Sequence, residues 1–379
     1  MSHLPHLRHC HSAALHACLR LLQIGAGGCE PVTLGWIFLW RCVVVALGLC
    51  GGMAPAQARP LDQAAACAKN PRVALQTVLP GLAVVHGQWP AEVEGLLGHA
   101  ATSVVLGQGR EVTVMDPGPT QKVGLTLQST LRCQGQDRVT AVINTHAHAE
   151  QVLGNAAFHA PVLATAGTAM SMKARCPACL RVLRQELGAK ALQGTRIVWP
   201  RRTLRDGQQL QAGGRTWHIL EMTLAHTESD LVLWSPPEGI VLVGGLVDGA
   251  RIPVLAQGRV LGWVQALDAL QALQARWLVG QGTVQGPGQV QDAIERQRAY
   301  LCGLVNFAWQ GLEHGWSEAE VLQGAVSPVL WPLETASQAA AWQRQHLFNQ
   351  LRAWREMERL WMDRQAGPQA CSSVPDVAR

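Results

Sequence analysis

Short apolar runs separated by turn residues mark the part of the chain that begins near residue 72. Runs at residues 82–86, 102–106 and 112–115 predict strands, and the last one ends in Asp116-Pro117-Gly118, a turn sequence. The pattern of residues 122–133 is helical. The apolar residues 141–144 then predict a buried strand that runs directly into a histidine-rich segment.

The second half of the chain repeats this alternation. Further strands are predicted at residues 197–199, 216–221, 231–234, 240–243 and 277–279, and helices at 167–189, 262–275, 290–314, 317–325 and 335–365. Pro177 lies inside the first of these helices and predicts a kink or a break there. Because the strands form two groups, each followed by helices, we expect two sheets covered by helices on their outer faces, an αββα sandwich of the α/β (α+β) class.

The first 58 residues have the features of a targeting segment. The apolar run CVVVALGLC follows Arg41, and Ala56-Gln57-Ala58 supplies an A-x-A cleavage site. The run is short for a bilayer span, which favours a cleaved secretory signal over the alternative, an uncleaved membrane anchor. We therefore expect a periplasmic or secreted protein without a stable membrane span, one compact domain over residues 59–365, and a flexible tail over 366–379.

Composition narrows the class of protein. Hydrophobic residues make up 48% of the 379 residues and charged residues 15%, so the chain can bury a large core. The net charge is +5, but the basic residues are scattered along the chain and form no block. This distribution argues against a nucleic-acid-binding surface.

Six cysteines lie beyond the targeting segment, at positions 67, 133, 176, 179, 302 and 371. An even number permits disulfides in an exported protein, but the spacing does not give the pairing. Cys176 and Cys179 form a C-x-x-C pair within a predicted helix. Because no thioredoxin-like pattern surrounds them, a structural disulfide or a family-specific feature is favoured over a redox-active pair.

Three histidines are candidate metal ligands. His146 and His148 follow the strand at 141–144 with the spacing i and i+2, so their side chains point to the same side. His226 follows the strand at 216–221. Three neutral imidazoles leave one position of a tetrahedral zinc ion open, which is the arrangement of catalytic zinc, where the ion activates a water as the nucleophile.

Five segments follow one another along the chain: VMDPGPT, VINTHAHAEQVLGNAAF, AHTESDLVLW, GGLVDGARIPVL and VGQGTV. In this order they together resemble the metallo-β-lactamase superfamily, and most closely its quinoprotein relay system zinc metallohydrolases. The resemblance covers about residues 72–365. It implies the metallo-β-lactamase fold, a Zn²⁺ ion bound by His146, His148 and His226, and a link to a quinoprotein system.

The second metal site of the superfamily is degenerate in this sequence. In its H-x-H-x-D-H motif, Glu150 replaces the aspartate and Gln151 replaces the last histidine, while Gly245 and Gln281 stand where the family has its bridging aspartate and its final histidine. Glycine offers no ligand, and amide oxygens bind zinc less well than imidazole does. We therefore expect one zinc per chain, with Glu150 as the catalytic general base.

Two functions remain open at this point. One is an exported zinc hydrolase with an unknown small-molecule substrate, since the fold alone does not identify a β-lactamase. The alternative is a catalytically inactive binding or accessory protein on the same fold. The resemblance gives Asp116 a supporting role beneath the histidine loop. We expect Asp230 to orient a turn, and Arg251 either contacts an anionic substrate or lies at the surface.

Overall fold

The computed structural model describes Cys67 and residues 73–86, 101–249, 251–324, 336–363 and 369–371. All of them belong to one compact unit, Leu61–Arg379. The predicted targeting segment, residues 1–58, lies outside the described residues. None of the helices in the described part of the chain combines the length and the apolar composition that crossing a bilayer requires.

The first sheet has seven strands that lie side by side in chain order. They are β1 (Gln76–Leu79), β2 (Leu82–Val85), β3 (Ser103–Leu106), β4 (Glu111–Met115), β5 (Arg138–Ile143), β6 (Val162–Thr165) and β7 (Arg202–Leu204). Strands β1 to β4 pair antiparallel, as short connections allow, and β4 to β7 pair parallel. The carboxyl ends of β4 and β5 therefore reach the same edge of the sheet.

The second sheet has six strands in the order β13-β12-β11-β10-β9-β8. They are β8 (Gln209–Ala212), β9 (Arg215–Thr223), β10 (Ser229–Ser235), β11 (Ile240–Asp248), β12 (Trp277–Gln281) and β13 (Thr283–Gln285). Only β11 and β12 pair parallel, and helix α7 (Val260–Ala272) forms the crossover between them.

Apolar side chains from the two sheets meet in a buried layer. Met115, Ile143 and Leu163 from the first sheet pack in one cluster with Trp217 and Leu233 from the second. Because side chains alternate along a strand, the same strands send their other residues to the outer helices. At the edge of the sandwich a hydrogen bond of 2.8 Å from the amide of Leu231 to the carbonyl of Thr145 joins the sheets directly.

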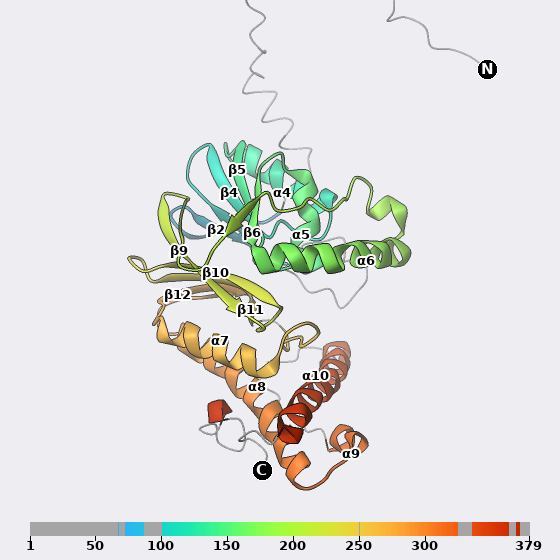
Figure 1. Ribbon diagram of the computed structural model, residues 1–379. Helices are drawn as coiled ribbons and strands as arrows, with labels where there is room; N and C mark the ends of the chain where they lie inside the picture. Colours follow the sequence, from blue (N-terminus) through green and yellow to red (C-terminus); the bar gives the residue numbers. More distant parts are fainter. Residues whose placement is uncertain are drawn as a thin grey trace, which may run out of the picture. The chain divides into compact units, whose positions relative to one another are not determined.

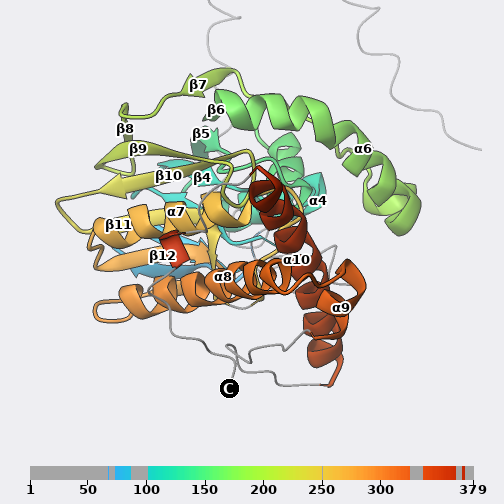
Figure 2. The same ribbon diagram turned by 60° about the horizontal axis from the view of Figure 1, so that its bottom comes forward.

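Helices cover both outer faces, which confirms the predicted αββα sandwich (Figure 1). On the first sheet lie α4 (Gln121–Cys133), α5 (Ala149–Val152), the 3₁₀ helix η2 (Leu153–Ala157) and α6 (Ala166–Ala191). On the second sheet lie α7 and α8 (Val290–Glu313), followed by α9 (Glu318–Gln323) and α10 (Ala336–Met362) (Figure 2).

Two local predictions were wrong. Residues 197–199 form no strand, and the edge strand β7 begins at Arg202 instead. Helix α6 continues through Pro177 and is interrupted at Gly188, whose φ of 81° lies in the left-handed region that glycine adopts readily. Pro177 is exposed, so the Lys173 carbonyl that loses its helical partner can bind water instead.

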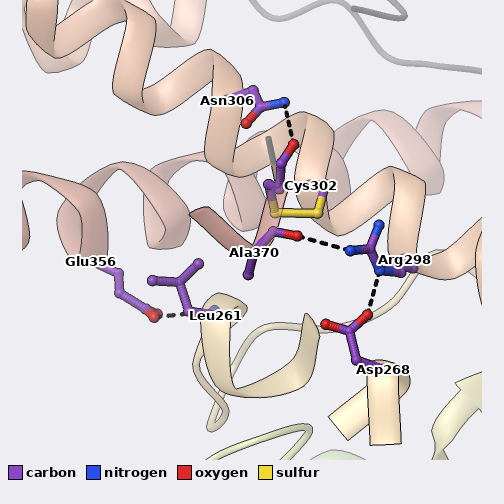
Figure 3. Close-up of a disulfide and its surroundings, with 8 residues drawn as sticks. Leu261, Asp268, Arg298, Cys302, Asn306, Glu356 and Ala370 are labelled. Atoms are coloured by element: carbon purple, nitrogen blue, oxygen red, sulfur yellow. Dashed lines mark hydrogen bonds and ion pairs between the residues drawn. A yellow bond between two sulfur atoms is a disulfide. The ribbon is translucent and has the colours of Figure 1, made fainter. Parts of the chain in front are cut away.

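Two disulfides hold the ends of the described chain. Cys67 is bonded to Cys133 at the end of α4, and Cys302 in α8 is bonded to Cys371 in the short helix η3 (Gln369–Cys371) (Figure 3). The predicted flexible tail is therefore anchored at residue 371. The other two described cysteines, Cys176 and Cys179, have free thiols, so the favoured structural disulfide between them is absent.

Polar contacts complete the attachment of the C-terminal elements to the second sheet. Arg298 binds the Asp268 carboxylate and the carbonyl of Ala370, next to the disulfide (Figure 3). The carboxylate of Glu356 accepts hydrogen bonds from the amides of Val260 and Leu261 at the first turn of α7. These contacts dock α10 on α7 and provide acceptors for amides that have none within the helix.

Candidate metal centre

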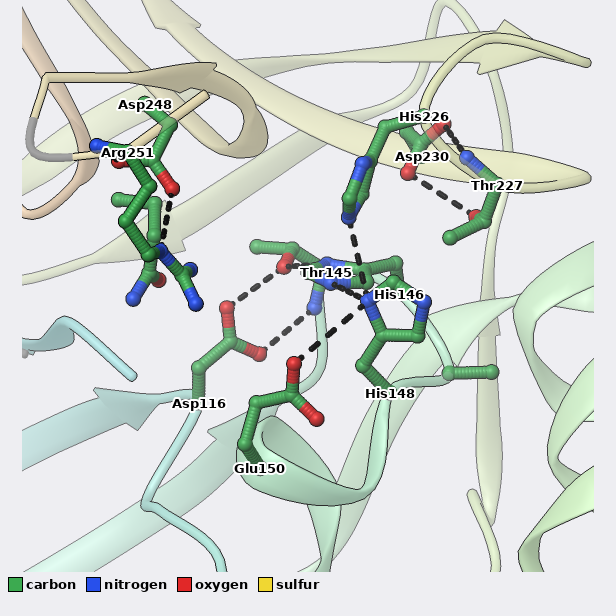
Figure 4. A network of polar contacts seen from close by, with 12 residues as sticks. Asp116, Thr145, His146, His148, Glu150, His226, Thr227, Asp230, Asp248 and Arg251 are labelled. Carbon is green, nitrogen blue, oxygen red and sulfur yellow. Dashed lines mark hydrogen bonds and ion pairs between the residues drawn. The ribbon is translucent and has the colours of Figure 1, made fainter. Parts of the chain in front are cut away.

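The three predicted histidines converge at the edge where the two sheets meet. His146 and His148 follow β5, and His226 lies between β9 and β10. The Nδ1 atom of His148 lies 3.0 Å from Nε2 of His146 and 3.1 Å from Nε2 of His226, and the ring centroids are 4.7 to 4.8 Å apart (Figure 4). One ring nitrogen from each residue therefore faces a common point.

Hydrogen bonds fix the tautomer of His146. The Thr145 hydroxyl donates to Oδ2 of Asp116 at 2.6 Å, so at 2.9 Å it can only accept a hydrogen from Nδ1 of His146. Nε2 of His146 is thereby left as a lone pair that faces the other two rings. Nε2 of His146 and Nε2 of His226 both face Nδ1 of His148, which can donate only one hydrogen, so at most one of them is hydrogen-bonded.

This donor set fits a metal ion. Ring nitrogens 2.0–2.1 Å from a tetrahedral zinc ion are separated by about 3.3 Å, close to the separations seen here. The three histidines could hold such an ion, since their ligand atoms all lie within 4.8 Å of one another. A bound cation would also remove the repulsion between lone pairs that the single hydrogen on His148 cannot resolve.

Burial keeps the imidazoles in the neutral form that binds metal. It lowers the pKa of His146 and His226 well below the ordinary value of 6.5 and lowers that of His148 as well. The positive charge of Arg251 contributes to the lowered pKa of all three rings, while Glu150 opposes the shift at His148. The histidines therefore bind few protons at neutral pH.

Asp116 supports the loop that carries His146, as the resemblance implied. Its Oδ1 accepts a hydrogen bond of 2.9 Å from the amide of Thr145, in addition to the bond from the Thr145 hydroxyl. Asp116 is buried and has a φ of 48°, a left-handed conformation that is uncommon for residues other than glycine. Burial raises the pKa of its carboxyl group to about 7, against the effect of the Thr145 hydrogen bonds.

Asp230 orients a turn, as predicted, and the turn is the one that follows His226. Its two carboxylate oxygens accept hydrogen bonds from the amide and the hydroxyl of Thr227, at 2.8 and 3.0 Å, which closes the turn after His226. The His226 ring packs edge-on against Trp263, with ring centroids 4.8 Å apart. Its Nδ1 atom has no hydrogen-bond partner among the described residues, so packing rather than a hydrogen bond orients this ring.

Glu150 lies beside the triad in the first turn of α5. One carboxylate oxygen is 3.9 Å from Nδ1 of His148, and about a third of the side chain is exposed to solvent (Figure 4). The carboxylate is thus close to the point on which the histidines converge, and water can reach it.

The residues at the positions that the resemblance assigns to a second metal, Gly245, Gln281 and Gln151, lie in packed surroundings. A Cβ atom on Gly245 would lie 2.5 Å from Cδ2 of His226 and 3.0 Å from Cε1 of His146, so the two rings occupy the space of a side chain there. Gln281 is buried and accepts a hydrogen bond of 3.2 Å from the amide of Thr102. Gln151 is also buried, and its Oε1 has no partner among the described residues.

Sequence reasoning missed two residues near the triad. Gln257 lies near His148, and its buried Oε1 atom has no hydrogen-bond partner among the described residues; a lone glutamine in a loop carries no signal in the sequence. Arg175 in helix α6 is ion-paired with Glu228, and its charge lowers the pKa of His148. Helical periodicity alone does not show that this face of α6 borders the site.

The comparisons with known proteins agree with this geometry. The family model of the metallo-β-lactamase superfamily matches residues 96–282, which include His146, His148, His226 and Gly245. Together with the solved structures described next, it supports the assignment of the chain to this superfamily. No curated protein sequence matches the chain.

Several solved structures share the fold. A metallo-β-lactamase family protein from Thermus thermophilus has a TM-score of 0.52 and 20% identity, with 77% of this chain and 98% of that chain covered. A β-lactamase domain protein from Burkholderia ambifaria has a TM-score of 0.52 and 15% identity, with coverages of 76% and 88%. A stereoselective inverting sec-alkylsulfatase from Pseudomonas sp. has a TM-score of 0.56 and 14% identity. It is aligned over 76% of this chain, which spans 50% of the sulfatase.

Proposed function

We propose that the protein is a zinc hydrolase that binds one ion through His146, His148 and His226. The observation that carries the proposal is the convergence of three ring nitrogens, of which that of His146 is held as a lone pair by the chain of hydrogen bonds to Asp116. When bound, zinc would supply an activated water and polarise the group under attack.

The side chains of the protein would divide the remaining work. Asp116 and Asp230 hold the loops that carry the histidines, so little reorganisation is needed on binding. Glu150 accepts the proton of the attacking water, because its carboxylate lies next to His148 and remains accessible to solvent. Glutamate is one methylene longer than the aspartate of the superfamily motif. From the backbone position that α5 sets for Glu150, its carboxylate would reach this proton.

Metal analysis and turnover test the proposal together. We expect close to one zinc per chain, and zinc-dependent hydrolysis in a screen of esters, lactams and sec-alkyl sulfates, the last because a solved structure with this fold is a sec-alkylsulfatase. His148→Ala should abolish both zinc binding and turnover. Glu150→Gln should keep the zinc and lower turnover by about 100-fold, the lower end for general-base catalysis. A zinc content far below one per chain contradicts the proposal.

Gly245, Gln151 and Gln281 favour a second candidate, a binding or accessory protein that has lost turnover. They remove a carboxylate and two imidazoles that the superfamily motif would supply. The two candidates differ in one result. If the wild type and Glu150→Gln both bind one zinc per chain and neither hydrolyses anything in the screen, the accessory protein is favoured.

We also propose that the protein is exported and acts with a quinoprotein dehydrogenase system. The two disulfides support export, since such bonds persist in oxidising compartments. Segments 154–158, 175–180 and 251–255 support the quinoprotein link by resemblance. Cell fractionation should place the protein outside the cytoplasm, with residues 1–58 removed. Deletion of the gene should lower quinoprotein dehydrogenase activity, and an unchanged activity contradicts the link.

A further inference from the structure

The guanidinium group of Arg251 stands beside the triad, on the side where the ligands of a second metal have been lost. We propose that Arg251 takes the electrostatic role of that metal and binds the anionic group of the substrate, which is then a small organic anion with a carboxylate or a similar oxyanion next to the bond that is cleaved. The inference rests on the proposed zinc site.

Arg251 is held firmly in place. Its amide donates a hydrogen bond of 2.9 Å to Oδ1 of Asp248, and its Nε donates one of 2.8 Å to Oδ2 of the same carboxylate. Asp248 ends strand β11 and is itself buried, and its own amide donates to Gln297 in α8 at 2.9 Å. The Arg251 side chain is 16% exposed, so a rigid part of the fold orients the guanidinium.

The guanidinium faces the metal centre. In Figure 4 it lies on the same side of the histidines as Asp116 and Glu150, and its terminal nitrogens are turned toward Asp116. Its charge affects all three rings, since it lowers the pKa of His146, His148 and His226 alike. A substrate group in this region would therefore meet both the guanidinium and the point on which the histidines converge.

The absence of a carboxylate at position 245 favours an anion over a second cation next to Arg251, whose guanidinium already has Asp248 as one anionic partner. A bridging carboxylate at position 245 would compensate a second metal ion, but Gly245 supplies no charge and the histidine rings leave no room for a side chain. A metal ion would also be repelled by Arg251 at short range, where the interior screens charges weakly. A carboxylate would instead receive two parallel hydrogen bonds from a guanidinium, a geometry that also fixes its orientation.

Arg175 provides a matched control at the same site. It also lies close enough to His148 to lower its pKa and is ion-paired, but its partner Glu228 is partly exposed and 38% of the Arg175 side chain is exposed. Removal of either arginine takes one positive charge from the surroundings of His148. Only Arg251 is fixed by a buried carboxylate next to the lost bridging position.

Two zinc-binding probes that differ by one carboxylate test the inference in the zinc-loaded protein. Acetohydroxamic acid and the monohydroxamate of succinic acid share the group that binds the ion, and calorimetry gives the affinity of each. We expect the carboxylate probe to bind the wild type at least about 10-fold more tightly. Arg251→Gln should remove this preference while leaving the zinc content and the affinity for acetohydroxamic acid unchanged.

Other variants separate the outcomes. Arg175→Gln should retain the preference for the carboxylate probe, and Arg251→Lys should retain part of it. Arg251→Lys also replaces Arg251→Gln as the test variant if the latter fails to fold. Equal affinities for the two probes in the wild type, or a preference that persists in Arg251→Gln, overturn the inference and leave the zinc site intact. Absence of zinc from the wild type, with neither probe bound, instead removes the proposed function and this inference with it.

Discussion

The two halves of the candidate metal centre differ in the residues that they contain. The half formed by the three histidines has a full complement of ligands, and a buried aspartate, Asp116 or Asp230, holds each of the two loops that carry them. The other half retains one acid, Glu150. The other positions that the resemblance assigns to this half hold a glycine, whose Cβ position is filled by the histidine rings, and glutamines that are buried.

The difference teaches that positions without metal ligands can still have a structural role. Gln281 accepts a hydrogen bond from the backbone amide of Thr102, the residue before β3, and Arg251 brings a fixed positive charge into the region. The positions that the resemblance assigns to a second metal are occupied here by packing and by a backbone hydrogen bond. Four predictions test this contrast, with the effect on zinc affinity as the common measure.

The largest effect is expected for Gly245→Ala. The added methyl group would collide with the rings of His226 and His146, so we expect zinc affinity to fall at least about 100-fold, the upper end for changes that misorient ligands. Competition with a chromophoric chelator measures this affinity. Gly303→Ala is the control, since no atom lies within 4 Å of its Cβ position on the exposed face of α8. Equal affinities in the two variants would show that space at position 245 does not matter.

Asp230→Asn should weaken zinc binding by about 10–100-fold, because asparagine keeps only one of the two carboxylate oxygens that accept hydrogen bonds from the amide and the hydroxyl of Thr227. Asp206→Asn is a suitable comparison. Asp206 also accepts an amide hydrogen bond, from Glu221, but it is exposed and belongs to another loop. The proposed support by Asp230 fails if both variants bind zinc like the wild type.

Acidification from pH 7.5 to 6.0 should lower zinc affinity by less than about 10-fold. Over this pH change, three histidines with the ordinary pKa of 6.5 would lose roughly 50-fold in zinc affinity through competition with protons. Here the pKa of each ring is lowered, so each stays neutral and able to bind as the pH falls through 6.5, and zinc is released only at lower pH. Zinc retained after dialysis at each pH gives the midpoint, and a midpoint above pH 6.5 contradicts the lowered values.

The smallest effect on zinc is expected at the glutamines. Gln281→Leu leaves the buried amide of Thr102 without this acceptor, so the free energy of unfolding should fall by about 1–3 kcal/mol while zinc affinity stays the same. Gln151→Leu removes an oxygen that has no partner among the described residues, and should leave stability unchanged or raise it. Chemical denaturation compares the two. A loss of zinc in either variant would make that glutamine a ligand.

The sequence alone predicted the architecture and the central histidines, for physical reasons that can be stated. Two groups of strands with helices between them require two covered sheets, and the spacing of His146 and His148 places both rings on one side of the chain. Short edge strands such as β1, β8 and β13 were missed because three or four residues show little periodicity. The break of α6 at Gly188 was missed because Pro177 is the stronger signal for a break.

What could not be predicted depends on contacts between distant residues. The tail beyond residue 365 has a polar composition, which predicts flexibility. Cys371 within it is nevertheless buried and bonded to Cys302, and the spacing of the cysteines does not determine this pairing. The place of Arg251 was left open between substrate and surface, because its environment comes from Asp248 and from the histidines of both sheets. The crowding around Gly245 likewise exists only in the folded protein.

The origin of the histidines in both sheets has a mechanical consequence. Two of them follow β5 of the first sheet and the third precedes β10 of the second, at the point where Leu231 and Thr145 already join the layers. An ion bound there would link the two sheets at this edge of the sandwich. The two layers cannot separate without releasing it, so its binding free energy is added to the resistance of the whole domain to heat and to proteases.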